Sequence, residues 1–438
     1  MRSPVAFLLA AAVLAPIGPG AFLPKAAAQQ PLPVFLRAAQ ERSLDVRQAA
    51  AALERARSQA AEARARFLPA LTGQGAYQRN APAVVIAVPT GMTDAMGAPV
   101  TRQATITPAD QFAALATMTV PIVDLSAWAN AASAGANADA ERENQDFVQE
   151  NVSIAVAQLW NGLVAQRALA EAAQKNVDAT QHSRDSISAQ VEVGVAGQLE
   201  LARAEAELAR ARQALAQARL QATLTARDLA DLSGVIPDET KATLEATPGE
   251  PPPPLQGVSQ TLHDLPAVRT ARARERAADL AENAAWRALF PVLAANAAAR
   301  WTNAAGFGHK DSYYAGLSAT WTLDFLKPAR IGTTRAELGA AEVQSERAAQ
   351  QAATALFDAW HRVQASRTSV EAALAGQQAS QRAAHDAQAR YESGTATQLD
   401  LIEAQRDAFQ ADVAVIQAAA NLNVARAELD VRRGLPLR

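Results

Sequence analysis

The sequence reads Val191-Glu192-Val193-Gly194-Val195-Ala196-Gly197-Gln198-Leu199-Glu200-Leu201 and, 200 residues later, Tyr391-Glu392-Ser393-Gly394-Thr395-Ala396-Thr397-Gln398-Leu399-Asp400-Leu401. Glu, Gly, Ala, Gln and Leu recur in register. The same offset relates Trp160 to Trp360, Arg167 to Arg367, Glu171 to Glu371, Asp124 to Asp324 and Gly234 to Gly434. A repeat close to half the chain in length indicates a duplicated module rather than a short solenoid.

The N-terminus has the pattern of an export signal. Arg2 is followed by an apolar run over Val5 to Ala15, and Ala26-Ala27-Ala28 fits a small-residue cleavage site. The run is too short to span a bilayer as a helix. No later stretch holds 18 consecutive apolar residues, so we expect a signal peptide at 1–28 and a mature protein without a transmembrane helix.

The composition narrows the class of protein. There is no cysteine, which excludes disulfides, thiolate metal sites, a cysteine nucleophile and a lipid-anchored N-terminal cysteine. Loss of residues 1–28 removes Arg2 and Lys25 and takes the formal charge from −3 to −5, which argues against nucleic acid as a partner. Abundant Ala and only 5% aromatic residues are typical of long helices. Export without cysteine fits a Gram-negative envelope protein.

Each module is expected to hold one very long helix and two shorter ones. In the first module, a helix over about 44–68 is capped by Ser43 and ended by Pro69, and the long helix covers about 126–191, roughly 99 Å. Gly194 breaks the pattern before a heptad helix over about 198–232. The second module repeats this with a helix over about 265–290 ended by Pro291. The two shorter helices, stacked end to end, match the long one, which predicts an antiparallel pair of roughly 90–100 Å.

Between the first two helices of each module the hydrophobic period changes to two. Alternating apolar residues over 70–123 and 291–324 predict one hairpin of two strands per module, each strand about ten residues long, the length of a tilted membrane-spanning strand. The connecting loop is short in the second hairpin (302–311). In the first it is about 78–111 and holds 22 extra residues. The aromatic residues expected at the membrane interfaces are Tyr77, Trp301, Tyr313, Tyr314 and Trp321.

The predicted organisation is a first module at 29–234, a connection at 235–262 and a second module at 263–438. The connection contains Pro251-Pro252-Pro253-Pro254, which cannot be helical. Four strands cannot close a barrel in lipid, so partner chains are required. A dimer would give 8 strands and a nearly filled lumen, and a trimer 12 strands and an open one. The fold class is therefore mainly α with a membrane β-barrel portion, a conduit of long coiled-coil-like helices and strands.

Four stretches resemble the most characteristic segments of the TolC-like outer-membrane efflux and secretion channels, and the resemblance covers essentially the whole mature chain. They are Tyr391 to Ala404, Phe67-Leu68-Pro69-Ala70-Leu71, and Val120 to Asp124 with its partner Trp321 to Phe325. The resemblance implies a homotrimer with a 12-strand outer-membrane barrel on a 12-helix periplasmic barrel. It also implies a periplasmic adaptor and an inner-membrane pump as partners. One branch of the family carries an acylated cysteine, which this chain lacks.

The resemblance places functional residues at the turns between the long helix and the last helix. The adaptor-docking turns, within 192–198 and 392–398, map onto Val193-Gly194-Val195 and Ser393-Gly394-Thr395, where the simpler interpretation is a helix cap. The acidic constriction maps onto Asp400 and Glu403, on one helix face, with Glu200 alone in the first module because Arg203 replaces the second acid. Here the simpler interpretation is two solvated acids in a first helical turn.

No pattern in the sequence indicates catalysis. The five histidines show no metal-ligand spacing and no Gly-rich phosphate loop is present, so we expect a non-enzyme without metal or cofactor whose energy source is a partner. Two alternatives stay open. The first expectation is efflux of small toxic molecules or metals, and the exit channel of a type I protein secretion system has the same architecture, so the sequence does not decide among drugs, metals and proteins as cargo. A periplasmic coiled-coil scaffold explains the helices but not the four alternating strands.

Overall fold

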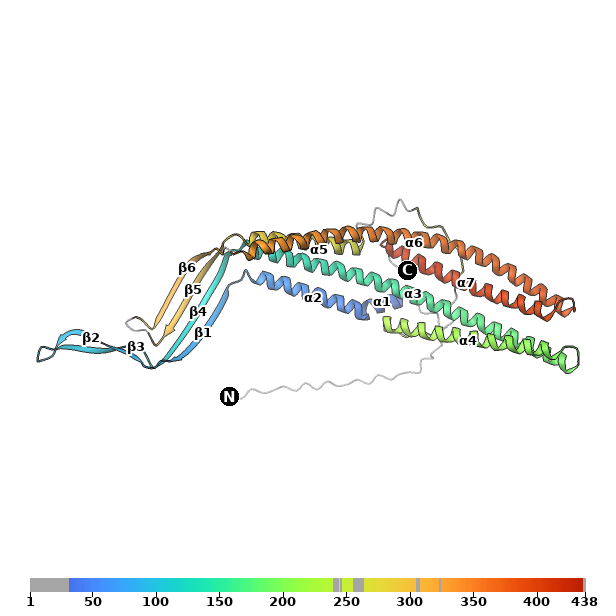
Figure 1. The fold of residues 1–438 in the computed structure, drawn as a ribbon, viewed down its shortest axis with the longest axis horizontal. Coiled ribbons are helices and arrows are strands. Elements are labelled where there is room, and N and C mark those ends of the chain that lie inside the picture. Colours follow the sequence, from blue (N-terminus) through green and yellow to red (C-terminus); the bar gives the residue numbers. More distant parts are fainter. Residues whose placement is uncertain are drawn as a thin grey trace, which may run out of the picture.

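The computed structural model describes residues 31–238, 244, 246–254, 264–304, 308–322 and 324–435, so the expected signal peptide lies outside it. The chain forms an elongated bundle of helices with strands at one end (Figure 1). In chain order the elements are α1 (Leu32–Arg42), α2 (Leu44–Ala65), β1 (Ala70–Arg79), β2 (Val84–Thr93), β3 (Pro99–Thr107), β4 (Asp110–Val123), α3 (Leu125–Glu192), α4 (Gln198–Ser233), α5 (Pro266–Arg287), β5 (Val292–Thr302), β6 (Asp311–Thr320), α6 (Leu326–Glu392) and α7 (Gln398–Arg432).

The helices follow the predicted duplication. Helix α3 has 68 residues, and the two shorter helices beside it, α2 and α4, have 22 and 36, together 58. In the second module α6 has 67 residues, against 22 and 35 for α5 and α7. Helix α3 packs against α2 and α4 of its own module and against α5 and α7 of the other, so it lies in the middle of the chain (Figure 1).

The two hairpins form one antiparallel sheet in the order β1-β4-β5-β6. Their pairing is copied residue for residue: Leu71 faces Met118 in the first hairpin, and Leu293 faces Ala319 in the second. The strand offsets are therefore 222 for β1 to β5 and 201 for β4 to β6. In the helices the repeat offset is 200, one less than between β4 and β6, because the first module has one extra residue at the end of β4. This residue lies where the register of β4 with β5 shifts, between Pro121 and Val123.

The register sorts the sheet into two faces. Residues directly opposite share a face, so one face carries mostly apolar side chains and the other carries Thr72, Gln74, Thr117, Asn296, Arg300 and Ser318. Tyr77, Trp301 and Tyr313 lie on the apolar face. Tyr314 pairs with Ala298 on the polar face, opposite to Tyr313, so the predicted interface aromatics do not all share one face of the sheet.

The predicted long loop at 78–111 is wrong. Most of it forms a second, two-stranded sheet, β2–β3, that projects beyond the end of the main sheet (Figure 1). Asn80 fixes its base: its backbone N–H donates to the Ala109 carbonyl at 2.7 Å, and its side-chain amide donates to Pro108 O and Gln111 Oε1. At the tip, Asp94 Oδ1 accepts backbone N–H groups of Met96 and Ala98. Interruptions of the alternation by Pro89, Gly91 and Pro99 hid these strands.

The predicted start of the helical part is incomplete, because α1 precedes α2 and was not expected. Ser43 occupies the position before α2, but its side chain makes no capping hydrogen bond. Its backbone N–H instead bonds Ala39 O at 2.9 Å and its carbonyl accepts from Arg47. Helix α2 ends at Ala65 rather than near 68, and α5 ends at Arg287 rather than near 290. In the described part of the chain, no helix combines the length and apolarity that crossing a bilayer requires.

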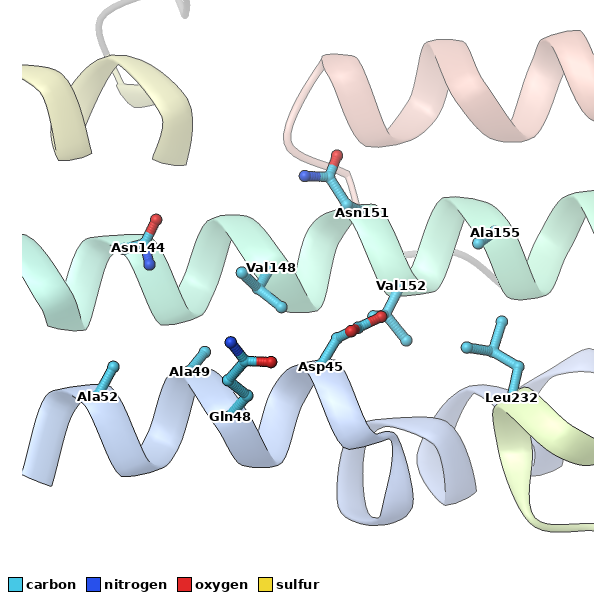
Figure 2. Close-up of a pocket in the computed structure, with 10 residues that line it drawn as sticks. All are labelled: Asp45, Gln48, Ala49, Ala52, Asn144, Val148, Asn151, Val152, Ala155 and Leu232. Carbon is cyan, nitrogen blue, oxygen red and sulfur yellow. The ribbon is translucent and has the colours of Figure 1, made fainter.

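The shorter helices meet end to end at two places, which we call joint one (start of α2, end of α4) and joint two (start of α5, end of α7). Figure 2 shows the groove at joint one, lined by Asp45 and Gln48 of α2, Val148 and Val152 of α3, and Leu232 of α4. The apolar core beside this groove is closed by α1, whose Phe35 is 1% exposed.

The connection between the modules is irregular where it is described. Residues 246–249 and 251–254 form neither helix nor strand, while 239–243, 245 and 255–263 lie outside the described residues. The segment is held on the second module, because the Trp360 indole N–H donates to Pro253 O at 2.8 Å.

Candidate functional sites at the helix turns and the sheet

The two turns at the far end of the helices are built by the same hydrogen bonds. After α3, the backbone N–H groups of Val195 and Ala196 donate to Gln190 O at 2.8 and 3.2 Å. After α6, Thr395 and Ala396 donate to Arg390 O at the same two distances. Gly194 and Gly394 have φ of +79° and +73°, the left-handed region that ends a helix.

These turns are also exposed. Val193 and Val195 are exposed, and an added Cβ on either turn glycine would meet no atom within 4 Å. In the second turn Ser393 Oγ and Thr395 Oγ1 both donate to Arg390 O, so its side chains strengthen the same bend. The predicted docking residues therefore form two rigid, exposed knobs that also cap the helices.

The predicted acidic residues begin the last helix of each module. Asp400 Oδ2 accepts the backbone N–H of Thr397 at 2.9 Å and its hydroxyl at 2.7 Å, which together hold the pKa of Asp400 below its ordinary value. Glu200 Oε2 accepts the Gly197 N–H in the same position. Asp400 and Glu403 are both exposed beside the buried Leu401 and Ile402. Within the chain, Asp400 and Glu200 act as helix-capping acids.

The sequence interpretation missed Gln398. Its side chain is 6% exposed and its amide N–H donates to the Glu200 carbonyl at 2.7 Å, joining the starts of α7 and α4. The repeat counterpart, Gln198, is exposed. Identical glutamines at the same offset were the available signal, but only the packing tells them apart.

A second missed contact lies about two helical turns further along. Glu207 Oε2 of α4 forms ion pairs with Arg406 Nη2 of α7 and with Arg210 Nη1 of its own helix, both at 2.8 Å. Burial acts to raise the pKa of Glu207, but the hydrogen bonds from these two guanidinium groups lower it overall. The two modules are thus tied near the turns by one amide and one ion pair.

The predicted interface aromatics lie at both ends of the sheet. Tyr77 and Trp301 lie at the outer end, where Tyr77 stacks with Phe112 at a ring-centroid distance of 5.1 Å. Trp321 follows β6 at the helical end, and its indole N–H donates to Leu289 O at 2.9 Å. Phe325 lies four residues after Trp321, and Phe290 directly follows Leu289, whose carbonyl accepts the Trp321 N–H; both phenylalanines are exposed. Two aromatic zones therefore bound the apolar face of the sheet.

The described residues contain no group of three or more His, Asp or Glu side chains placed to hold an ion. The long helices, the two turns and the four-stranded sheet define a class of fold, elongated helical proteins that carry a short strand sheet at one end.

The comparisons with known proteins identify the family. The family model for outer membrane efflux proteins matches residues 35–235 and 257–434, and the chain belongs to that family. The outer membrane efflux protein BepC of Brucella suis is 24% identical over 301 residues, which span 68% of this chain and 66% of BepC.

Solved structures share the fold. CusC, described for its folding and transmembrane channel formation, superposes with a TM-score of 0.79 at 18% identity, covering 92% of both chains. The Campylobacter jejuni CmeC outer membrane channel gives 0.77 at 16%, covering 92% of this chain and 85% of CmeC. The open MtrE channel of Neisseria gonorrhoeae gives 0.76 at 20%, covering 92% and 89%. The predicted fold class and family are therefore confirmed.

Proposed function

We propose that the protein is a homotrimeric outer-membrane channel that conducts substrates from an inner-membrane pump and a periplasmic adaptor to the exterior. The observation that carries this proposal is the sheet. Its two edge strands, β1 and β6, are exposed, and an open edge in lipid leaves backbone groups unpaired at several kcal/mol each. Three copies close a wall of 12 strands.

The internal repeat predicts which strands would pair between neighbouring copies. Inside the chain, β4 of module one pairs with β5 of module two, with Met118 facing Ala297. The strand offsets carry this pair onto Ala319 of β6 and Gly75 of β1 in the next copy. Both edges then have a partner with apolar and polar faces aligned, since Gly75 and Ala319 lie on the apolar face.

The turns suit adaptor docking. Val193, Gly194 and Val195 with Ser393, Gly394 and Thr395 are exposed on a rigid backbone and lie at the end opposite the sheet (Figure 1). In a trimer six such knobs form a ring around the periplasmic end. This arrangement matches a partner that also presents repeated helical ends.

Asp400 and Glu403, with Glu200, provide the charge at that end. Three copies bring these acids around one axis, and rings of carboxylates favour cations in pores. The hydrogen bonds from the Thr397 hydroxyl and backbone N–H lower the pKa of Asp400 and so favour its charged form. Asp400→Asn with Glu403→Gln should reduce cation selectivity in single-channel recordings more than Glu200→Gln does. Unaltered selectivity in the double variant would place the constriction elsewhere.

Disulfide cross-linking tests the closed wall directly, because the chain has no native cysteine. Gly75→Cys together with Ala319→Cys should give covalent trimers on oxidation in membranes. A matched pair, Gly75→Cys with Tyr313→Cys, moves one thiol six residues along β6, roughly 20 Å, and should not link. Covalent dimers that never close into trimers, or no links at all, would refute the proposed assembly.

A further inference from the structure

The two modules meet inside the chain where α3 packs against α5 and α7, and we call this contact the seam. Ion pairs lie near the middle of its length. Arg269 of α5 places Nε 2.7 Å from Glu143 Oε2 and Nη2 3.3 Å from Asp146 Oδ2, both on α3. Arg432 of α7 reaches Glu150 of α3 at 3.6 Å. A fourth ion pair joins Arg274 of α5 to Glu141 of α3 at 4.0 Å, so α3 meets α5 and α7 through four ion pairs near joint two.

The same seam recurs between copies if the proposed trimer forms, since module two of one copy then faces module one of the next. The repeat offsets give the residues equivalent to each contact. Arg269 of module two corresponds to Arg47 in module one of the next copy. Glu143 and Asp146 of module one correspond to Val343 and Glu346 in module two of the first copy. Arg432 becomes Leu232 and Glu150 becomes Gln350, so that pair has no counterpart.

The two residues that this translation selects are free in the chain. Arg47 on α2 and Glu346 on α6 are both exposed, and in the described residues neither side chain makes an ion pair or hydrogen bond. They also lie on edge helices. Helix α3 separates α2 from the second module, and α6 contacts only α5 and α7 among the major helix packings.

We propose that Arg47 of one copy pairs with Glu346 of the next and forms the ionic contact of the seam between chains. This inference rests on the proposed trimer and adds a specific partner surface to it. Val343, exposed in the single chain, packs against the aliphatic part of the arginine, in the place that Glu143 takes beside Arg269.

The glutamine pair supports the same translation at the turns. Inside the chain the buried Gln398 donates to Glu200 O. Carried across the seam, the exposed Gln198 of the next copy donates to the Asp400 carbonyl. The ion pair between Arg406 and Glu207 is not repeated, because the corresponding residues are Ala206 and Asp407. The seam between chains thus has fewer ionic contacts than the seam within each chain.

Reciprocal charge reversal tests the proposal. Arg47→Glu and Glu346→Arg each place like charges together at three seams, and each should speed trimer dissociation in detergent by about tenfold or more. The double variant should restore the wild-type rate, an outcome that general damage to either helix does not give. Single variants with wild-type dissociation rates, or a double variant worse than both, would overturn the pairing.

Cross-linking separates failure of this pairing from failure of the trimer. Arg47→Cys with Glu346→Cys should give covalent trimers, while Glu62→Cys with Glu346→Cys should not, since Glu62 lies 15 residues along α2, roughly 22 Å away. If Gly75→Cys and Ala319→Cys link but Arg47→Cys and Glu346→Cys do not, the trimer stands and the pairing is wrong. If neither pair links, the proposed function itself fails.

Discussion

Joint one and joint two solve the same structural problem with different chemistry. Both are places where two shorter helices abut beside a long one. Joint one is closed by α1 through apolar contacts, with Phe35, Val46, Val156 and Leu229 buried together. Joint two has no such helix among the described residues, and Arg269 and Arg432 reach the acids of α3 instead.

The equivalent tryptophans keep the same kind of position in both modules. Trp160 packs against the apolar cluster that α1 closes, and Trp360 packs against the apolar cluster of α6 and α7 and donates its indole N–H to Pro253 O. A duplicated backbone therefore kept its geometry while the cover over each joint changed. Apolar closure should be insensitive to salt, and ionic closure should not.

The largest effect is expected at joint one. Phe35→Ala removes a fully buried ring and should cost about 3–5 kcal/mol of unfolding free energy, because the cavity cannot fill completely. Denaturant unfolding followed by circular dichroism measures it. Val34→Ala, on the exposed side of the same helix, is the control and should change little. Equal effects of the two variants would show that α1 is not a structural cover.

Joint two should respond less strongly and differently. Arg269→Ala leaves Glu143 and Asp146 without their cation and should cost about 1–3 kcal/mol, less than a buried pair because the arginine is partly exposed. The loss should shrink as salt is added, whereas that of Phe35→Ala should not. Arg276→Ala on the same helix serves as the comparison. A salt-independent loss at Arg269 would contradict the ionic description of joint two.

The turns test whether some parts of the two modules remained equivalent. Gly194→Val and Gly394→Val should each cost about 1–2 kcal/mol, since the added side chain has space but φ is positive. Both should also weaken adaptor-dependent export while leaving trimers intact. Ser393→Val, at φ −83°, should cost less. Unchanged export in the double glycine variant would refute a role for the turns.

The smallest effect concerns pH at joint two. Burial raises the pKa of Glu150 above 4.5, and Arg432 and Arg269 only partly oppose the rise. The folded state therefore keeps this proton to a higher pH than the unfolded state does. The contribution of Glu150 to the free energy of unfolding falls as the pH rises from about its ordinary pKa through the raised one. Glu150→Gln cannot titrate. When the unfolding free energies of both proteins are measured over that pH range, the wild-type value should fall relative to that of the variant. Parallel curves would disprove this.

Much of the fold was predictable because the hydrophobic periodicity of the sequence and its internal repeat determine it. The repeat offsets, the change to period two and the turn at Gly394 predicted the modules, the sheet strands and the helix breaks. Helix α1 escaped because 11 residues with Pro33 show no sustained pattern. The β2–β3 ribbon escaped because prolines and glycine interrupt its alternation. The partners of Gln398 and Arg406 lie on another module, and no local pattern records such a contact.

The strand registers would also set the dimensions of the closed wall in the proposed trimer. Ala76 faces Ala113, which faces Thr302, four residues beyond Ala298, the repeat counterpart of Ala76. Six modules would accumulate a shear of about 24 residues over 12 strands, which tilts the strands by roughly 55° and gives a backbone diameter of about 30 Å. Side chains about 5 Å long on the inner surface leave a bore of roughly 20 Å. In the proposed trimer, a register copied by duplication would thus make the wall too wide for its own side chains to fill.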